Sequence, residues 1–404
     1  MPHEFCPSIP DLETISIPTA RISTSPLRAT SRVEAFLRDA DYDGPRLVVD
    51  LDVVRQRYSA YVHAMPGTRI YYAVKANPAP EVLQILADLG SCFDTASIPE
   101  IEAVLALGVA PDRISFGNTI KKEVDISRAH AMGVRLFAFD SDAELEKIVR
   151  SAPGAQVFCR VRCDGTGADW PLSRKFGCST RTAVELLLEA HRKGLDVQGV
   201  SFHVGSQQRR AEAWDVALAT VADVYRTLCE RGLKMPVINM GGGFPAAQYR
   251  EEVPPIDDYA ASIDHALRRH FDWTLPEAII EPGRGLVADA GVIEAEVVLI
   301  ARKDQSGPRW VYLDIGRFGG LAETEDEAIR YVIRTPKDGD DLAPAILAGP
   351  TCDSIDVLYE KEPYWLPVSL EIGDRVRIEA AGAYTASYSS VGFNGFAPLQ
   401  SYFV

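Results

Sequence analysis

The sequence lacks the features that place a protein in a membrane or on nucleic acid. It has no apolar run long enough to span a bilayer, and its first residues show no basic segment followed by an apolar one. Basic residues are scarce, because 42 Lys and Arg face 57 Asp and Glu, which gives a formal net charge of −15. Such an acidic protein is not attracted to nucleic acid or to anionic lipid. We therefore expect a cytoplasmic protein that binds neither.

The seven cysteines and seven histidines do not show the spacing of a metal site. An odd number of cysteines without regular spacing indicates free thiols in a reducing compartment. Cys159 and Cys163 lie close together, but neither a second pair nor a nearby histidine completes a zinc site. The HExxH pattern of zinc hydrolases is missing as well. We expect no metal ion.

What the sequence does contain is a regular alternation of strand-like and helix-like segments. Runs rich in β-favouring residues are separated by amphipathic helical patterns, in the number expected for a (β/α)8, or TIM, barrel. The strand-like runs are 69–75, 92–95, 114–117, 135–139, 156–162, 199–203, 237–240 and 278–281. The main helical patterns are 80–89, 99–107, 142–149, 181–193, 211–231 and 257–270. The sequence thus predicts an α/β fold with a barrel as its larger part.

The segments on either side of this barrel differ from it in composition. After residue 285 the pattern becomes β-rich, which predicts a C-terminal antiparallel β domain. Its strands are expected at 292–300, 310–313, 332–334, 345–348, 366–370 and 375–379. The predicted divisions are an N-terminal arm at 1–44, a barrel at 45–285 and a β domain at 286–404.

The arm is rich in Pro, Ser and Thr up to about residue 28, which predicts loose attachment. Its last part is expected to pack on the β domain, with a short helix at 32–40 that Ser31 caps. The apolar run 47–50 is expected to join the barrel or to lead into it.

Lys75, at the end of the first barrel strand, is the first candidate for chemistry. Alternation along a strand places Tyr71, Ala73 and Lys75 on one face. A half-buried amine has a lowered pKa and is a nucleophile able to form a Schiff base. A surface lysine whose amine reaches into solvent is the alternative interpretation.

Polar residues follow other strands at the end where barrel enzymes place their active sites. Gly241, Gly242 and Gly243 follow one strand directly, and successive glycines allow backbone N–H groups to surround a phosphate. Arg284 follows another strand and suits bidentate binding of the same phosphate, to which Ser206 adds a hydroxyl. A tight turn is the alternative interpretation of the glycines.

An acid and an imidazole complete the set of strand-end residues. Glu281 suits pairing with a protonated ring nitrogen or, alternatively, a salt bridge with Arg284. His203 suits stacking on a flat cofactor or, alternatively, a hydrogen-bonded place in the core. An amine nucleophile, a phosphate site, an acid and a stacking imidazole together indicate pyridoxal 5'-phosphate (PLP).

Seven motifs occur in the order found in a known family. They are AVKANP, HVGSQ, GGGFP, EPGR, GPTCDSID, GAYT and FNGF. From about residue 45 to its end, the chain resembles the PLP-dependent ornithine/lysine/arginine/diaminopimelate decarboxylases, which share a barrel with alanine racemases.

The resemblance implies a role for each residue of the cofactor site. Lys75 would form the Schiff base, His203 would stack on the ring, and Glu281 would pair with the ring nitrogen. The phosphate would lie among Ser206, Gly241, Gly242, Gly243, Gly283, Arg284 and Tyr384. Asp94, Glu100 and Arg160 would support the ring and the lysine.

The resemblance also implies a homodimer whose subunits share their active sites. Cys352 and Asp353 would reach the site from the other subunit, with Cys352 as the proton donor to the substrate, and Phe393 would lie near the substrate. An aspartate after the cysteine is similar to the ornithine/lysine branch. Glu323, or another acid of 323–327, would bind the distal amine together with Asp353.

The expected reaction is therefore α-decarboxylation of a basic L-amino acid in polyamine biosynthesis. L-Ornithine would give putrescine, and L-lysine would give cadaverine. An amino acid racemase, a decarboxylase of diaminopimelate, arginine or a modified amino acid, and a silent homologue that regulates a partner stay open as alternatives.

Overall fold

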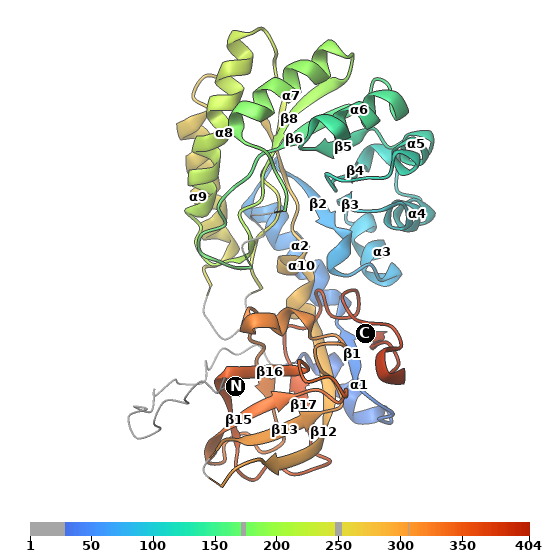
Figure 1. Cartoon of the computed structure of the whole chain (residues 1–404), viewed down its shortest axis with the longest axis vertical. Helices are drawn as coiled ribbons and strands as arrows, with labels where there is room; N and C mark the ends of the chain where they lie inside the picture. The colour runs from blue at the N-terminus through green and yellow to red at the C-terminus, as the bar shows by residue number, and fades with distance from the viewer. Residues whose placement is uncertain (1–28, 171–174, 247–252, 306) are drawn as a thin grey trace, which may run out of the picture.

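The computed structural model describes residues 29–170, 175–246, 253–305 and 307–404. The loosely attached arm predicted up to about residue 28 lies outside these ranges. Two bodies are visible in Figure 1, with the barrel in blue, green and yellow and the second domain in orange and red. Among the described helices, none has the length and apolar character needed to cross a bilayer.

The larger body is a closed barrel of parallel strands, which confirms the predicted fold. Neighbouring strands follow the order β10, β11, β2, β3, β4, β5, β6 and β8 around the barrel. Inside it, Tyr71 packs with Val237 and Ile279, while Tyr72 faces outward into the main core. The predicted alternation is therefore confirmed for Tyr71 and Tyr72, but the strand ends at Ala73, two residues before the predicted end at Lys75. The strands are β2 (Arg69–Ala73), β3 (Cys92–Thr95), β4 (Ile114–Phe116), β5 (Leu136–Phe139), β6 (Gln156–Arg160), β8 (Asp196–Ser201), β10 (Val237–Asn239) and β11 (Glu277–Ile280).

Helices surround the barrel (Figure 1). Their apolar residues pack on the outward side chains of its strands. Two of the helices were not predicted. One has buried residues at Val54, Tyr58 and Tyr61, the spacing of a helical face, and is capped by Asp50, which accepts from the backbone N–H of Asp52. The helices are α2 (Leu51–Ala64), α3 (Pro80–Asp88), α4 (Ile98–Ala106), α5 (Glu123–Ala131), α6 (Asp142–Ser151), α7 (Thr180–Arg192), α8 (Ala213–Glu230) and α9 (Ile256–His270), of which α2 and α5 are the additional ones.

The second domain is a curled sheet in the order β14, β17, β12, β13, β15 and β16, with β1 and β18 at its side. Most pairs are antiparallel, but β13 and β15 run parallel. The strand predicted at 366–370 is wrong, because the chain is extended earlier and turns after Pro367. The strands are β1 (Arg46–Val49), β12 (Gly291–Arg302), β13 (Arg309–Leu313), β14 (Ile333–Arg334), β15 (Leu342–Ala348), β16 (Val357–Pro367), β17 (Arg375–Ile378) and β18 (Gln400–Phe403).

The segment before the barrel belongs to the second domain. β1 pairs antiparallel with β12 and parallel with β18, so 47–50 does not join the barrel but, as the other expectation had it, leads into it through α2. Figure 1 shows the blue β1 and α1 (Ser31–Asp39) beside the orange and red strands. Val33 and Leu37 of α1 pack on Val48 and Val292. Thr30 caps this helix in place of the predicted Ser31, since its Oγ1 accepts from the backbone N–H of Val33 at 3.3 Å.

The second domain contacts the barrel beside the end of β2. The side chain of Asn77 donates to the carbonyl oxygen of Gly382 at 3.0 Å, and the backbone N–H of Tyr384 donates to Ala76 at 2.8 Å. The end of β2 is therefore held by a part of the chain that lies more than 300 residues further along the sequence.

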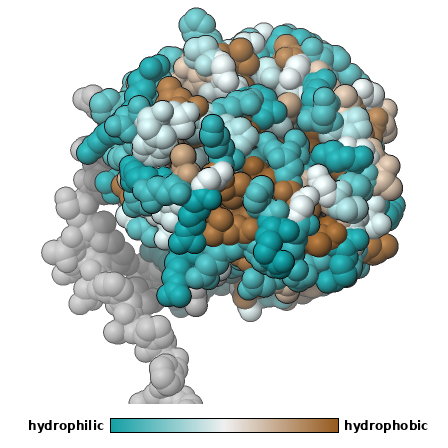
Figure 2. Space-filling model, turned by 90° about the horizontal axis from the view of Figure 1, so that it is seen from above, coloured by the Kyte–Doolittle hydropathy of each residue, from teal (hydrophilic) through white to brown (hydrophobic). Residues whose placement is uncertain are grey.

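The surface at the barrel end of the molecule is mixed. Seen from this end, apolar patches alternate with hydrophilic residues (Figure 2).

Candidate active site

Lys75 lies on a single 3-10 turn, η2 (Val74–Ala76), directly after β2. The hydroxyl of Ser387 donates to its carbonyl oxygen at 2.9 Å, which ties the turn to the second domain. Lys75 keeps an exposed surface but lies among protein atoms and several charged groups. The loss of surrounding water is the largest single effect and lowers the pKa of Lys75, but Tyr384, Asp94 and Glu281 together outweigh it and raise this pKa. The sequence predicted a lowered pKa for Lys75. This prediction is wrong for the polypeptide chain by itself.

Two acids beside Lys75 come from neighbouring elements of the barrel. Asp94 on β3 is buried, and its carboxylate accepts from the Ser115 hydroxyl at 3.0 Å. Burial and then Glu281 raise the pKa of Asp94 well above its usual range. Glu100 on α4 accepts from the backbone N–H of Ala96 at 2.6 Å, and burial raises its pKa too. Both acids therefore hold a proton more readily than in water.

Arg160 ends β6 and supplies a cation on the same side of the barrel. Its guanidinium lies 5.0 Å from the centre of the Phe176 ring. Burial lowers the pKa of Arg160, whereas Glu281 and Asp94 raise it. An arginine keeps its proton at neutral pH despite such a shift. It therefore balances part of the negative charge of these two acids.

His203 follows β8 and is held in one tautomer. Its Nδ1 accepts a hydrogen bond from the backbone N–H of Gly205 at 2.9 Å, so the ring proton lies on Nε2. Burial, Arg160 and Lys75 together lower the pKa of His203 well below its ordinary value. His203 is therefore a neutral, oriented ring at neutral pH, and its flat face suits stacking on a flat cofactor.

The three glycines after β10 fill a space that admits no side chain. A Cβ on Gly241 would overlap the carbonyl oxygen of Phe202, and its φ of +63° also favours glycine. A Cβ on Gly242 would lie 2.6 Å from the Glu281 carbonyl oxygen, and one on Gly243 would lie 2.6 Å from that of Gly205. The turn thus packs tightly between the strand ends that carry His203 and Glu281.

Glu281 is positioned by Asn239, a residue that the sequence did not single out. The Asn239 amide donates to Oε1 of Glu281 at 2.5 Å, and its own oxygen accepts from the backbone N–H of Gly241 at 2.9 Å. Asn239 is 2% exposed, so both bonds are shielded from water. The only sign of this role in the sequence is that a polar residue, Asn239, ends the otherwise apolar strand β10.

The alternative prediction was a salt bridge between Glu281 and Arg284. In the structure Glu281 bonds Asn239, and Arg284 pairs with Glu323.

Arg284 gathers the other residues predicted to hold a phosphate. It begins the short helix α10 (Arg284–Val287), and its Nε and Nη2 lie 3.4 and 3.3 Å from the Ser206 hydroxyl. The Tyr384 ring lies 4.9 Å from its guanidinium carbon. A Cβ on Gly283 would lie 2.9 Å from Cβ of Ala76. Ser206, Gly283, Arg284 and Tyr384 therefore meet beside the turn that carries Lys75.

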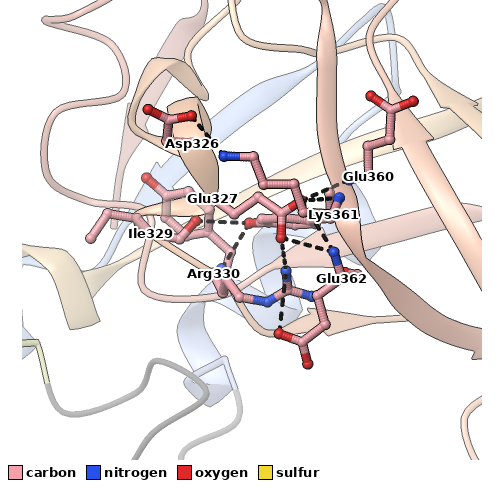
Figure 3. Close-up of polar contacts among 9 residues, drawn as sticks. Asp326, Glu327, Ile329, Arg330, Glu360, Lys361 and Glu362 are labelled. Carbon is pink, nitrogen blue, oxygen red and sulfur yellow. Dashed lines mark hydrogen bonds and ion pairs between the residues drawn. The ribbon is translucent and has the colours of Figure 1, made fainter. Parts of the chain in front are cut away.

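The acids of 323–327 lie on η5 (Ala322–Glu327) and point to different partners. Both carboxylate oxygens of Glu323 accept from Nη2 of Arg284, at 2.6 and 2.7 Å. Glu327 accepts from the backbone N–H groups of Glu360 and Lys361 and pairs with Arg330 (Figure 3). Glu323 thus lies at the predicted phosphate end of the site, bonded to an arginine. This place gives no support to its predicted role at the substrate amine.

Cys352, Asp353 and Phe393 lie on loops of the second domain. The backbone N–H of Cys352 donates to the Asn394 side chain at 2.8 Å, and the Phe393 ring lies 4.5 Å from that of Phe318. These loops border a cavity of about 230 Å³. Within the described part of the chain, the hydrogen bonds of Cys352 and Asp353 stay inside these loops and do not reach the Lys75 group. A single chain therefore presents two separate sets of predicted site residues.

Asp356 organises the loop that carries Cys352, and the sequence motif gave it no role. It is buried and accepts from the backbone N–H of Arg317 at 2.8 Å and from the Thr351 hydroxyl at 2.7 Å. Gly316 and Gly349 pack so closely on its carboxylate that a Cβ on either would overlap it. Its place in the motif, four residues after Cys352, was the only signal.

The barrel set has the chemical groups that PLP needs. The glycine turn follows β10 at the same end of the barrel, Arg284 and Ser206 offer donors for a phosphate, and Lys75 follows β2 beside Tyr384. A family model for the pyridoxal binding domain of pyridoxal-dependent decarboxylases matches residues 51–288. The chain belongs to the pyridoxal-dependent decarboxylase family. PLP is accordingly its cofactor, and the enzyme class that the motifs predicted is confirmed.

Relatives match this decarboxylase over most of its length. Lysine/ornithine decarboxylase of Selenomonas ruminantium is 33% identical over 87% of this chain and 87% of its own. Antizyme inhibitor 2 of Xenopus laevis is 35% identical over 86% of this chain and 78% of its own. A lysine/ornithine decarboxylase of Vibrio vulnificus, solved with cadaverine, has a TM-score of 0.82 at 33% identity and covers 93% of this chain and 100% of its own.

Proposed function

We propose that this decarboxylase acts on L-ornithine, forming putrescine, and on L-lysine, forming cadaverine, in polyamine biosynthesis. The observation that carries the proposal is the complete cofactor set around Lys75, together with a Cys352-Asp353 loop on a separate surface. The Selenomonas and Vibrio relatives named for lysine and ornithine support this choice of substrates. One methylene separates the two substrates, and a pocket distinguishes that by only ~1–3 kcal/mol.

The barrel residues bind and orient the reacting groups. PLP, when bound, supplies an electron sink for cleavage of the bond between Cα and the carboxylate. Lys75 would hold the cofactor through its amine, and neutral His203 would offer its ring face. Glu281, oriented by Asn239, would hold a proton on the ring nitrogen. Ser206, the glycine turn, Gly283, Arg284 and Tyr384 would bind the phosphate, with Asp94, Glu100 and Arg160 around the ring and the lysine.

The substrate end of the site would come from a second copy of the chain. Cys352 would deliver the proton to Cα, Asp353 would pair with the distal ammonium, and Phe393 would line the pocket. In the described chain these loops carry apolar side chains that are exposed to solvent, among them Ile355, Phe396 and Val391. Val391 is 82% exposed. Burial of these side chains would favour a homodimer. This arrangement accounts for two separate residue sets in one chain.

A cytoplasmic location fits the thiol chemistry. The described cysteines, Cys352 included, are free rather than paired in disulfides. A reducing compartment keeps thiols in this state.

A turnover assay tests the proposal directly. Purified protein with PLP is offered L-ornithine, L-lysine, L-arginine and meso-diaminopimelate, and CO2 and amine are quantified. We expect putrescine and cadaverine as the main products. Lack of turnover with all four substrates would defeat the proposal, whereas D-amino acid without CO2 would indicate a racemase.

A regulatory role is the second candidate, because a relative as similar as the others is named antizyme inhibitor 2. Retention of Lys75, Glu281, Arg284 and Cys352 favours catalysis. Protein that neither binds PLP nor releases CO2 would favour the regulatory role.

A further inference from the structure

A buried ion pair joins the second domain to the predicted phosphate site. Nη2 of Arg284 bonds both carboxylate oxygens of Glu323, at 2.6 and 2.7 Å. Arg284 is 3% exposed and Glu323 is 7% exposed, so water screens the pair poorly. The same guanidinium group faces Ser206 and Tyr384, which are also predicted to contact the phosphate. The carboxylate of Glu323 therefore stands next to the place of the phosphate.

The segment that carries Glu323 is firmly anchored. The carboxylate of Glu327, at the end of the same turn, accepts from the backbone N–H of Glu360 at 2.8 Å and of Lys361 at 2.5 Å (Figure 3). Arg330 pairs with Glu327 at 2.5 Å and also donates to the carbonyl oxygen of Glu362 at 2.9 Å. The backbone N–H of Ile329 donates to the carbonyl oxygen of Glu323 at 3.0 Å. The turn that carries Glu323 is thus bonded to β16 through Glu327 and to Ile329 through the Glu323 carbonyl oxygen.

Two anions at one guanidinium oppose each other. A phosphate on Arg284 would lie close to the Glu323 carboxylate in a poorly screened site, where like charges repel strongly. Conversely, loss of both the phosphate and the Glu323 carboxylate would leave the buried charge of Arg284 less compensated, which destabilises a fold. Glu323 therefore has two opposite effects, one on the stability of the chain and one on its affinity for phosphate.

We propose that Glu323 is a built-in counter-ion of Arg284 that competes with the cofactor phosphate and so sets the affinity for PLP. The carboxylate neutralises Arg284 when the phosphate leaves, which stabilises the cofactor-free chain. It also weakens phosphate binding, so that PLP exchanges more readily. This inference rests on the proposed role of Arg284 at the phosphate.

The test measures PLP binding and stability in full-length protein freed of PLP by dialysis against hydroxylamine, which displaces the cofactor from its Schiff base, and then against buffer. Glu323→Gln keeps the shape of the side chain and removes its charge. We expect its Kd for PLP to fall about tenfold, its Tm without PLP to fall, and the rise in Tm on adding PLP to grow. Protection against heating by inorganic phosphate should strengthen in the same direction, independently of Lys75.

Glu325→Gln is the matched control, because it removes one charge from the same turn at an exposed side chain that pairs with Arg317 at 3.4 Å. Its Kd for PLP should not change. Glu323→Asp, which keeps the charge but retracts it, should bind PLP with a Kd between those of wild type and Glu323→Gln, and it serves as the test if the Gln variant does not fold.

Two outcomes overturn the inference in different ways. If Glu323→Gln leaves the Kd unchanged or raises it, Glu323 orients Arg284 or is neutral, and competition is wrong. Arg284→Met tests the underlying assignment, since it should weaken PLP and inorganic phosphate binding. If Arg284→Met leaves both unchanged, the proposed phosphate site itself fails.

Discussion

Replacing Asn239 by alanine tests whether this residue positions Glu281 for catalysis in addition to stabilising the fold. The change removes the hydrogen bond to the Glu281 carboxylate and leaves the buried N–H of Gly241 without the Asn239 oxygen. A hydrogen bond to a charged group contributes ~1.5–3 kcal/mol, and a buried unsatisfied N–H costs about 1–3 kcal/mol. Unfolding free energy should therefore fall by about 2.5–6 kcal/mol.

The same substitution should also slow catalysis. If the bond to Glu281 acts fully in the transition state, its loss lowers kcat about ten- to hundredfold. The assay measures kcat with saturating PLP and substrate, alongside denaturant unfolding. Thr95→Val is the control, because it removes one buried hydrogen bond, from Oγ1 of Thr95 to the carbonyl oxygen of Ser115, without touching Glu281. It should lower stability and leave kcat near wild type. An Asn239→Ala enzyme with wild-type kcat would refute the positioning role.

Three further predictions follow from particular contacts. Gly241→Ala should lower Tm and weaken PLP binding, because its Cβ would overlap the Phe202 carbonyl and strain the backbone by about 1–3 kcal/mol; calorimetry and PLP titration measure both, and unchanged values would contradict the tight turn. Asp356→Ala should lower kcat while PLP absorbance stays as in wild type, since it loosens only the Cys352 loop; loss of PLP would contradict this. Burial raises the pKa of Glu379 from 4.5 to about 7, so stability should fall by about 2–3 kcal/mol as pH rises from 4.5 through 7. Urea unfolding across this range should show that slope in wild type and a flatter profile in Glu379→Gln, and equal slopes would contradict it.

The barrel and most of the residues around Lys75 could be predicted because their signals are local. Each strand end carries its own polar residue, and the closed barrel brings these ends together whatever the details of packing. Lys75, His203, Glu281 and Arg284 were found in this way. The tight packing of the glycine turn agrees with its three consecutive glycines.

The features that the sequence did not reveal depend on long-range contacts. β1 joins the second domain because it pairs with β12 and β18, strands more than 240 residues away, and a short apolar run does not specify its partner. Asn239, Asp356 and the pairing of Glu323 with Arg284 depend equally on which side chains meet in space. The raised pKa of Lys75 has the same origin, since neighbouring groups outweigh burial.

A subunit-mixing experiment tests the central claim most directly, namely that PLP-dependent decarboxylation uses Lys75 of one copy and Cys352 of another. Lys75→Ala and Cys352→Ala are each expected to be strongly impaired alone. When the two variants are co-expressed, half of the randomly assembled dimers are mixed, and each mixed dimer has one intact site, so activity should return to about a quarter of wild type. Co-expressed protein that contains mixed dimers yet stays as inactive as the separate variants would contradict the account.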